Sequence, residues 1–361
     1  MKSIRLVLTC ATACFALHLA ASVSANEWRK GAEAIGLAAA QDLLKRSEFV
    51  FNRSDHFNGI HYAEAAAGYG ALRFLHALSR KDLAEAISRR LDKAPGSQNL
   101  AEVNHVDASV WGALLLQRAI SGGSNADRAA GLSLANAQWV PPLPNGLTRQ
   151  ARFWIDDIWM IGILQIQAYR ATKDPLYLDR AARTAVAYVE KLQQPNGLFH
   201  HGPNAPHFWG RGNGWVASGL AEIIGELPQD HPARPALVKA FVKMIDTLIS
   251  HQADSGLWRQ VIDHPTAWKE TSATAMFGFA IAVGVECGLL KGEKYREAYR
   301  RAWKGLSMKV DGNGILRDIC VGTGKSRDVA YYLERPAIAG DLHGQAPLLW
   351  FAERLLAVEK E

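Results

Sequence analysis

Two adjacent acidic residues lie in the apolar stretch FWIDDIWM, which spans residues 153–160. Asp156 and Asp157 are the only charged residues of that stretch. Ionised carboxylates rarely lie among apolar side chains without a reason, because removing their charge from water costs free energy. A carboxylate at the start of a helix stabilises the helix dipole, whereas one that lines a cavity can act as a general acid or base. The stretch alone leaves both interpretations open.

Other residues that could do chemistry gather at the starts of predicted helices and in nearby loops. They form four groups: Asn104-His105-Val106-Asp107, His200-His201-Gly202, the run FWGRGNGW at 208–215, and Lys269-Glu270-Thr271-Ser272. Aromatic faces cover the apolar faces of sugar rings, and arginine clamps a carboxylate through paired hydrogen bonds. Together the groups indicate a pocket for an acidic sugar. Taken singly, the same residues are also explained as helix caps, loop histidines and packing tryptophans.

Several motifs that would indicate another class of protein are incomplete. The glycines of the run 210–214 do not follow a predicted strand, which argues against a dinucleotide site. The segment 322–326 resembles the end of a P-loop, but Ile319 occupies the position of its first glycine. The sequence has neither a His-Glu-x-x-His zinc motif nor a Gly-x-Ser-x-Gly elbow. We therefore expect no metal or organic cofactor, and the diffuse net charge of +6 indicates no nucleic-acid partner.

The elements that position these groups are predicted to be helices almost throughout. Apolar residues recur with helical spacing in twelve stretches: 30–45, 61–79, 82–92, 105–120, 126–137, 154–171, 175–194, 213–227, 235–252, 270–289, 293–308 and 340–357. Only 314–320 and 328–333 are predicted as short strands. The stretches show no fixed-length repeat, which argues against an open solenoid. We predict one all-α domain over residues 26–361, an (α/α)6 barrel of six helical hairpins around a funnel.

The first 25 residues have the features of a secretory signal. Lys2 and Arg5 precede an apolar stretch that is too short to span a membrane, and Val23-Ser24-Ala25 offers a cleavage site. We therefore expect a periplasmic or secreted product with no membrane partner. Cys287 and Cys320 remain after cleavage, which is too few for a disulfide framework, and their pairing stays open. Cys287 is predicted as a small core residue.

The motifs together resemble those of the unsaturated rhamnogalacturonyl hydrolases of glycoside hydrolase family 105. The unsaturated glucuronyl hydrolases of family 88 are a more distant match. The matching stretches occur in the family's order: Trp154-Ile155-Asp156-Asp157 with Met160, Phe199-His200-His201-Gly202, 208–215, 270–275 and Asp341-Leu342-His343-Gly344. The family fold is an (α/α)6 barrel, in agreement with the helix pattern. The short loop between His201 and Trp209 and the segment 311–328 depart from the family's pattern.

The resemblance implies hydrolysis of oligosaccharides that carry a 4,5-unsaturated uronic acid at the non-reducing end, as polysaccharide lyases leave them. Such chemistry needs one carboxyl group in a partly desolvated site, because desolvation raises the pKa of a carboxyl group. By family precedent, Asp156 is the general acid/base, and Asp107 is a second aspartate that hydrogen-bonds the sugar and tunes Asp156. Further residues are implied to contact or enclose the substrate: His201, Trp209, Arg211 (the candidate for the uronate carboxylate), Trp215, Trp154 and Met160.

The expected partner is an anionic oligosaccharide, with rhamnogalacturonan-type pectin fragments as the expected source. Whether the sugar beside the uronic acid is rhamnose or another sugar stays open. Two other functions stay compatible with the sequence. One is an (α/α)6 glycosidase or lyase that acts on saturated sugars. The other is a non-catalytic oligosaccharide-binding protein, which would keep Trp209, Trp215 and Arg211 but have little use for a buried acid. The sequence does not disclose the linkage or the oligomeric state.

Overall fold

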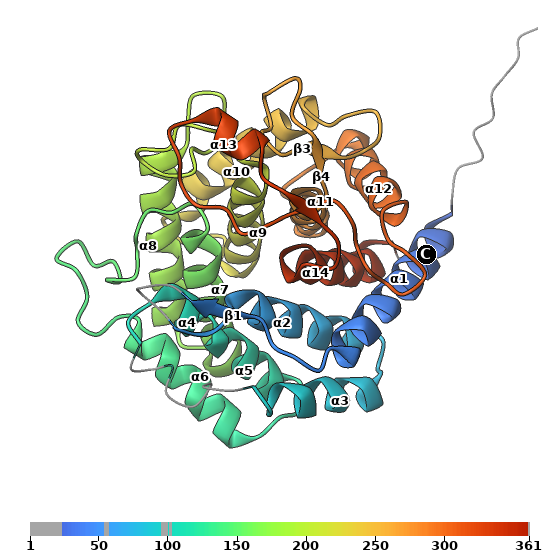
Figure 1. Ribbon diagram of the computed structural model, residues 1–361. Coiled ribbons are helices and arrows are strands. Elements are labelled where there is room, and N and C mark those ends of the chain that lie inside the picture. The colour runs from blue at the N-terminus through green and yellow to red at the C-terminus, as the bar shows by residue number, and fades with distance from the viewer. Residues whose placement is uncertain (1–23, 54–57, 95–99, 101–102, 360–361) are drawn as a thin grey trace, which may run out of the picture.

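The computed structural model describes residues 24–53, 58–94, 100 and 103–359. Six helices form a closed ring in which each helix packs against the next (Figure 1). These inner helices are α2 (Tyr62–Ala77), α5 (Trp111–Ile120), α7 (Asp157–Thr172), α9 (Gly210–Glu226), α11 (Thr271–Glu286) and α14 (Leu342–Val358). The ring closes where α14 packs against α2.

A second layer of helices surrounds this ring (Figure 1). It consists of α1 (Ala25–Lys45), α3 (Lys81–Leu91), α6 (Asn125–Ala137), α8 (Pro175–Leu192), α10 (Arg234–Ser250) and α12 (Glu293–Ser307). The helices α3, α6, α8, α10 and α12 each pack on the inner helix that precedes them, and α1 packs chiefly on α14. The predicted (α/α)6 barrel is confirmed.

The two layers differ in the pattern of their apolar residues. In α11, every residue from Thr271 to Gly284 is buried, because the helix is covered on all sides. In α12, the buried residues recur every three or four positions between Tyr295 and Leu306, which leaves the other face to solvent. This difference distinguishes the inner helices from the outer ones in the sequence.

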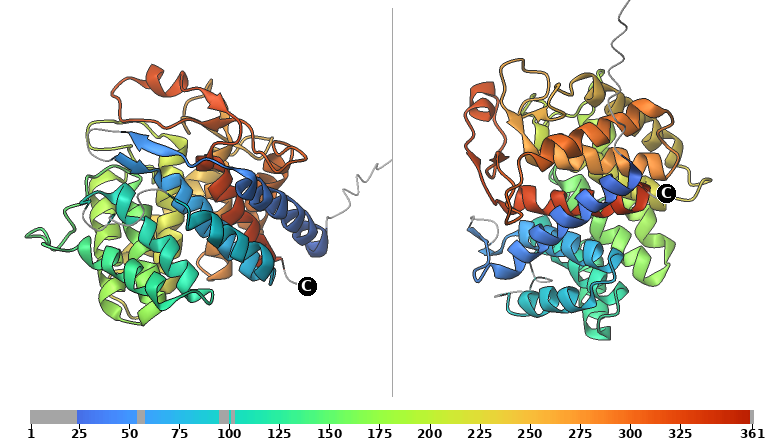
Figure 2. Two further views of the ribbon diagram at one scale, coloured as in Figure 1. Left: turned by 60° about the horizontal axis from the view of Figure 1, so that its bottom comes forward. Right: turned by 90° about the vertical axis from the view of Figure 1, so that its right-hand side faces the viewer.

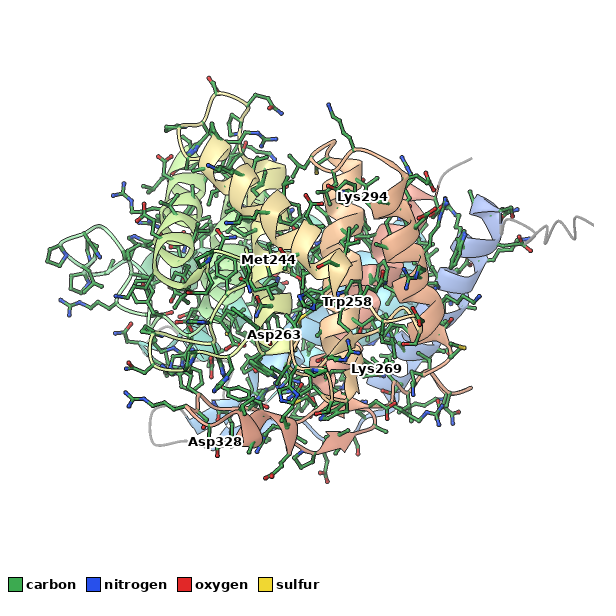
Figure 3. All side chains as sticks on the ribbon, turned by 90° about the horizontal axis from the view of Figure 1, so that it is seen from above. Met244, Trp258, Asp263, Lys269, Lys294 and Asp328 are labelled. Atoms are coloured by element: carbon green, nitrogen blue, oxygen red, sulfur yellow. The ribbon has the colours of Figure 1, made fainter. Side chains whose placement is uncertain are left out.

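The inner helices all begin at one end of the barrel, and the outer helices begin at the other. In Figure 3, Lys269 just before α11 lies at the same end as Asp263 and Asp328, whereas Lys294 at the start of α12 lies at the opposite end. The end where the inner helices begin, which lies at the bottom of Figure 3, is named the upper end, and the opposite end is named the base.

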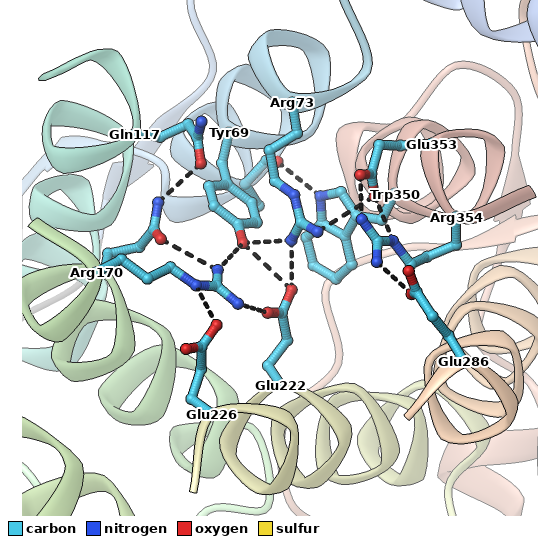
Figure 4. Close-up of polar contacts among 12 residues, drawn as sticks. Tyr69, Arg73, Gln117, Arg170, Glu222, Glu226, Glu286, Trp350, Glu353 and Arg354 are labelled. Atoms are coloured by element: carbon cyan, nitrogen blue, oxygen red, sulfur yellow. Dashed lines mark hydrogen bonds and ion pairs between the residues drawn. The ribbon is translucent and has the colours of Figure 1, made fainter. Parts of the chain in front are cut away.

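An ion-pair network closes the base (Figure 4). Arg73 of α2 contacts Glu222 of α9 at 2.5 Å and Glu353 of α14 at 3.2 Å, and Arg170 of α7 contacts Glu222 at 2.7 Å. Arg170 also pairs with Glu226, and Arg354 with Glu286, so that five inner helices contribute charges. The carbonyl ends of helices carry partial negative charge, which favours arginines there. Because these ion pairs fill the base, a substrate site is expected at the upper end.

Short ribbons and turns cover the upper end (Figure 2). Three antiparallel pairs are described: β1 (Phe51–Arg53) with β2 (Asn58–Ile60), β3 (Trp258–Arg259) with β4 (Lys269–Glu270), and β5 (Ile319–Cys320) with β6 (Ala337–Ile338). In the last pair Ile319 lies opposite Ile338. The pairs lead into α2, α11 and α14, and two short helices, α4 (Val106–Ser109) and α13 (Val329–Leu333), complete the surface.

The twelve predicted helical stretches all contain helices, and three details of the prediction were wrong. The stretch 105–120 is divided into α4 and α5, and the predicted strand 328–333 is the helix α13. Cys287 ends α11 and is exposed, so it is not a core residue, and both it and Cys320 are free thiols. The predicted secretory signal lies almost entirely outside the described residues. Among the helices described, none is long and apolar enough to cross a membrane.

Candidate active site

A cavity of about 220 Å³ lies at the upper end of the barrel. Its lining comes from the starts of α2, α4, α7 and α9 and from the loops beside them. The lining residues are Asn52, Tyr62, His105, Asp107, Arg152, Trp154, Asp156, Met160, Trp209 and Thr323. Five of the eight residues implied by the family resemblance are thus brought together: Asp107, Trp154, Asp156, Met160 and Trp209.

Asp156 immediately precedes α7 and is 7% exposed. Its side chain makes no capping hydrogen bond to the helix, although its backbone already has helical angles. The carboxylate oxygen Oδ2 lies 3.8 Å from Nε2 of His201. Within the described part of the chain, no donor lies within hydrogen-bonding distance of this carboxylate. Asp156 therefore offers the cavity a carboxyl group whose oxygens are not committed to the protein.

Asp157 is fully buried and is surrounded by donors. Arg152 approaches Oδ1 with Nη2 at 2.5 Å and Nε at 3.1 Å, while the hydroxyl of Tyr188 donates to Oδ2 at 2.7 Å. The backbone N–H groups of Arg152 and Trp154 also donate to Oδ2. Burial raises the pKa of Asp157, and the charge and hydrogen bonds of Arg152 oppose that shift. Asp157 thus fixes the segment before α7 rather than facing the cavity.

Asp107 lies on α4 with a side chain that is 12% exposed. Asn52 donates to its Oδ2 at 3.3 Å, and Nη2 of Arg152 lies 3.7 Å from Oδ1. Burial raises the pKa of Asp107 to about 7; the charge of Arg152 opposes the shift, and the charges of Asp157 and Asp156 add to it. Asp107 can therefore carry a proton near neutral pH and donate a hydrogen bond.

His201 lies behind Asp156 and is fully buried. Its Nδ1 is hydrogen-bonded to the hydroxyl of Tyr332 at 2.8 Å, and its ring packs on Trp209 with 4.6 Å between centroids. No hydrogen-bond partner for Nε2 is found in the described part of the chain. The unpaired nitrogen lies on the Asp156 side of the ring, so His201 supports Asp156 rather than lining the cavity.

Arg211 and Trp215 also lie behind the cavity wall. The guanidinium of Arg211 donates to the carbonyl oxygens of Cys320 and Val321 and stacks on Trp209, 4.8 Å from the ring centroid. Trp215 is buried against Trp159, with 4.9 Å between centroids. The contacts of Arg211 anchor the loop after β5 and hold Trp209, and they differ from those of a residue that clamps a substrate carboxylate.

Two cations near the cavity were not singled out from the sequence as site residues. Arg152 lines the cavity, and its guanidinium carbon lies 5.4 Å from the ring centroid of Trp154. The ammonium of Lys325 lies 4.4 Å from the same centroid, and burial lowers its pKa. Lys325 belongs to the incomplete P-loop motif, so the sequence marked this lysine, but as part of a nucleotide-binding motif and not of a sugar-binding cavity. Tyr62, Asn52 and Thr323 were missed because isolated polar residues carry no motif.

Comparison with known sequences identifies the family. The family model described as Glycosyl Hydrolase Family 88 matches residues 38–358. The chain belongs to this family. An unsaturated 3S-rhamnoglycuronyl hydrolase from Alteromonas sp. (strain LOR) is 28% identical over 187 residues, which cover 48% of this chain and 45% of that protein. The unsaturated rhamnogalacturonyl hydrolase of Bacillus subtilis (strain 168) is 24% identical over 215 residues, covering 57% and 60%. The chain thus matches about half the length of these curated relatives.

Solved structures share the fold of this family 88 chain. A possible member of family GH105 from Salmonella enterica aligns with a TM-score of 0.80 and 19% identity, over 98% of this chain and 99% of that one. The unsaturated glucuronyl hydrolase of Bacillus sp. GL1 aligns with a TM-score of 0.66 and 15% identity, over 92% and 97%. The family match, the curated relatives and these shared folds together confirm the resemblance to families 105 and 88.

Proposed function

We propose that this family 88 protein releases a 4,5-unsaturated uronic acid from the non-reducing end of lyase-generated oligosaccharides. The observation that carries the proposal is the contrast between two adjacent acids. The Asp156 carboxylate faces the cavity, and no hydrogen-bond donor among the described residues contacts it, whereas the Asp157 carboxylate accepts hydrogen bonds from Arg152 and Tyr188. A carboxyl group can deliver its proton to a substrate carbon only if its oxygens are not already hydrogen-bonded to the protein.

The substrate's C4=C5 bond and ring oxygen form a vinyl ether. Asp156 donates its proton to C4, which leaves an oxocarbenium-like centre at C5. Water adds its oxygen to C5 and returns one proton to the Asp156 carboxylate, so the enzyme is restored. The resulting hemiketal opens and releases the uronic acid as a keto-uronate together with the shortened saccharide. One carboxyl group is sufficient, whereas an ordinary glycosidase needs two beside the glycosidic oxygen.

The other residues of the site are given roles according to their places. Asp107, with a pKa of about 7, donates a hydrogen bond to a sugar hydroxyl and adjusts the charge beside Asp156. Trp154, Met160 and Trp209 enclose the sugar ring. From behind the wall, His201 steadies Asp156. Arg211 and Trp215 shape the wall by packing, and their direct contact with the substrate, which the family resemblance implies, stays a prediction.

Lys325 beside Trp154 favours an anionic substrate. Its ammonium lies 4.4 Å from the centroid of this cavity tryptophan, and among the described residues it has no carboxylate within ion-pair distance, whereas Arg152 on the same ring is already paired with Asp157. A uronate carboxylate is a group that such an ammonium attracts. The name of the Bacillus relative refers to a rhamnogalacturonyl substrate, and that of the Alteromonas relative to a 3S-rhamnoglycuronyl one. On the basis of the Bacillus relative and of the family 105 motifs, we propose rhamnogalacturonan-type pectin fragments as the source of the substrate.

The conjugated double bond of the substrate absorbs ultraviolet light, which gives a direct test. The purified protein is incubated with lyase products of pectin, of ulvan and of glycosaminoglycans. Loss of absorbance, fastest with the pectin products, is expected. A rise in absorbance with an intact polysaccharide would indicate a lyase instead. Binding of the oligosaccharides without any loss of absorbance would leave only a binding protein.

We also propose that the chain is exported, on the basis of the apolar stretch and cleavage site within residues 1–25. Expression of the full sequence in a Gram-negative host is expected to give a shortened protein in the periplasm. Retention of the uncleaved chain in the cytoplasm would contradict this proposal.

A further inference from the structure

Three side chains form a hydrogen-bonded series that leads from the start of α14 to the cavity. The carboxylate of Asp341 lies 2.6 Å from Nδ1 of His343, and Nε2 of the same ring lies 2.7 Å from the hydroxyl oxygen of Tyr62. Tyr62 is the first residue of α2 and lines the cavity together with Asp107 and Asp156. The series therefore spans the seam where the ring of inner helices closes.

The direction of the two hydrogen bonds depends on the charges of the groups that form them. Burial opposes ionisation of Asp341, but the backbone N–H of His343 donates to its Oδ1 at 2.8 Å and the charge of Arg211 favours the ionised form. An ionised carboxylate only accepts hydrogen bonds, so Nδ1 of His343 carries a hydrogen. In the neutral form of the ring this is the single N–H, so Nε2 accepts and the hydroxyl of Tyr62 donates.

A tyrosine hydroxyl has one hydrogen, and beside a neutral His343 ring that hydrogen is committed to Nε2. Burial raises the pKa of Tyr62 well above its usual value, and the charge of Asp156 adds to that shift, so the phenol keeps its hydrogen. Its oxygen then presents lone pairs, and no hydrogen, to the cavity. We propose that the His343 ring is neutral, that Tyr62 is a further catalytic residue that accepts a hydrogen bond from an O–H group beside Asp156, and that Asp341 and His343 are positioning residues that keep it an acceptor.

The inference rests on the proposed function and deepens it. Two O–H groups are available: the attacking water and a hydroxyl of the uronate ring. The water loses one hydrogen to Asp156 as its oxygen adds to C5, and its second hydrogen stays on the oxygen. An acceptor that holds this second hydrogen orients the water before attack. A ring hydroxyl held in the same way would instead fix the position of the sugar.

The first test is the kinetics of Tyr62→Phe with an unsaturated oligosaccharide. Loss of this hydrogen bond is expected to lower kcat/KM roughly 10- to 100-fold. A loss in kcat at constant KM identifies the water as the bonded group, whereas a rise in KM at constant kcat identifies the sugar hydroxyl. A kcat/KM close to that of the wild type would overturn the role of Tyr62.

A pair of variants at His343 separates positioning from packing. In His343→Gln, the amide can donate to Asp341 through its nitrogen and accept from Tyr62 through its oxygen, so this variant is expected to keep most of the wild-type activity. In His343→Leu, no acceptor remains for Tyr62, and the loss should match that of Tyr62→Phe. Equal losses in the two variants would contradict the positioning role. His231→Leu is the matched control, because His231 pairs with Asp179 on the surface at 3.2 Å.

The direction of the hydrogen bonds is tested without any turnover. Nitrogen chemical shifts of the His343 ring, assigned by comparison with His343→Gln, report which ring nitrogen carries hydrogen. A neutral ring protonated at Nδ1 is expected. A ring protonated at Nε2, or at both nitrogens, would overturn the inference even in an active enzyme. Conversely, a wild-type protein with the expected ring but no activity on any unsaturated oligosaccharide would refute the proposed function.

Discussion

At the scale of the residue, two adjacent carboxylates have different roles because their side chains point in different directions. Asp156 and Asp157 lie on either side of the start of α7. Successive side chains at a helix start point about 100° apart, since the α-helix has about 3.6 residues per turn. Asp157 therefore meets Arg152 and Tyr188, while Asp156 meets the cavity. The difference between the two acids lies in their surroundings and not in their type.

Replacing Asp156 by asparagine is expected to abolish turnover and preserve binding. The substitution keeps the shape of the side chain but removes the transferable proton, and general acid–base catalysis contributes about 10²- to 10⁴-fold. Calorimetric titration with an unsaturated disaccharide should show affinity near that of the wild type. Asp157→Asn is the comparison, because it removes the charge of a fully buried carboxylate that Arg152 contacts at 2.5 Å, and it should lower the melting temperature instead. Near-normal turnover by Asp156→Asn would refute its assignment.

Asp107 should make the stability of the fold depend on pH. Its pKa is raised to about 7 in the folded protein, against the ordinary value of 3.8. The folded state thus binds the proton more tightly, so its stability falls as pH rises from below the ordinary value through about 7. Asp107→Asn removes this dependence. The difference in the free energy of unfolding between the variant and the wild type should therefore grow by roughly 2–3 kcal/mol in favour of the variant as the pH rises from 5 to 8. Urea unfolding at the two pH values measures the difference, and an unchanged difference would contradict the raised pKa.

At the scale of the element, the helices were predictable from the sequence because the apolar residues that they bury recur with helical spacing. The inner helices were recognisable from apolar residues on all sides, as in α11, and the motif residues indeed lie at helix starts. The stretch 328–333 was misjudged as a strand because tyrosines favour strands, whereas Asp328 caps a single helical turn by accepting from the N–H of Ala330. The role of Arg211 was not predictable, because its carbonyl partners come from a loop more than a hundred residues away.

The network at the base should matter for stability and not for catalysis. Burial raises the pKa of Glu222, but the charges of Arg73 and Arg170 outweigh it and hold that pKa well below its usual value. The stabilisation is therefore present above the ordinary pKa of a glutamate and is lost as pH falls. Glu222→Gln removes the buried carboxylate that Arg73 and Arg170 share and leaves them only Glu353 and Glu226, so it should cost about 3–5 kcal/mol in the free energy of unfolding.

The matched control for Glu222 is Glu226→Gln. Among the described residues Glu226 pairs with Arg170 alone, and its side chain is 26% exposed, so its loss should cost about 1 kcal/mol or less. Both variants, assayed at a temperature where they are folded, are expected to keep the wild-type kcat/KM. A loss of activity in folded Glu222→Gln would show that the base is coupled to the cavity.

At the scale of the whole molecule, the barrel gathers helix starts around one cavity. Residues in or just before the first turns of α2, α4, α7 and α9 line it, and Arg211 lies just behind. The N-termini of helices carry partial positive charge and unpaired N–H groups, which favour an anionic ligand. The opposite ends of the inner helices meet the arginines of the base. A parallel ring of helices thereby separates the part that binds substrate from the part that holds the barrel closed.

Closure of the ring depends on the contact between its first and last inner helices, α2 and α14. A Cβ atom on Gly70 would lie 2.4 Å from Cδ1 of Trp350, whose indole is 2% exposed and donates to the carbonyl of Ala66 at 3.0 Å. Since the indole has no room to move, Gly70→Ala should cost roughly 1–3 kcal/mol despite the better helix propensity of alanine. Gly31→Ala in α1 is the control: its nearest atom would lie 3.9 Å away, so it should gain about 0.5–1 kcal/mol. Thermal unfolding followed by circular dichroism measures both shifts. A Gly70→Ala variant as stable as Gly31→Ala would show that the seam tolerates extra volume and that the ring is not held closed there.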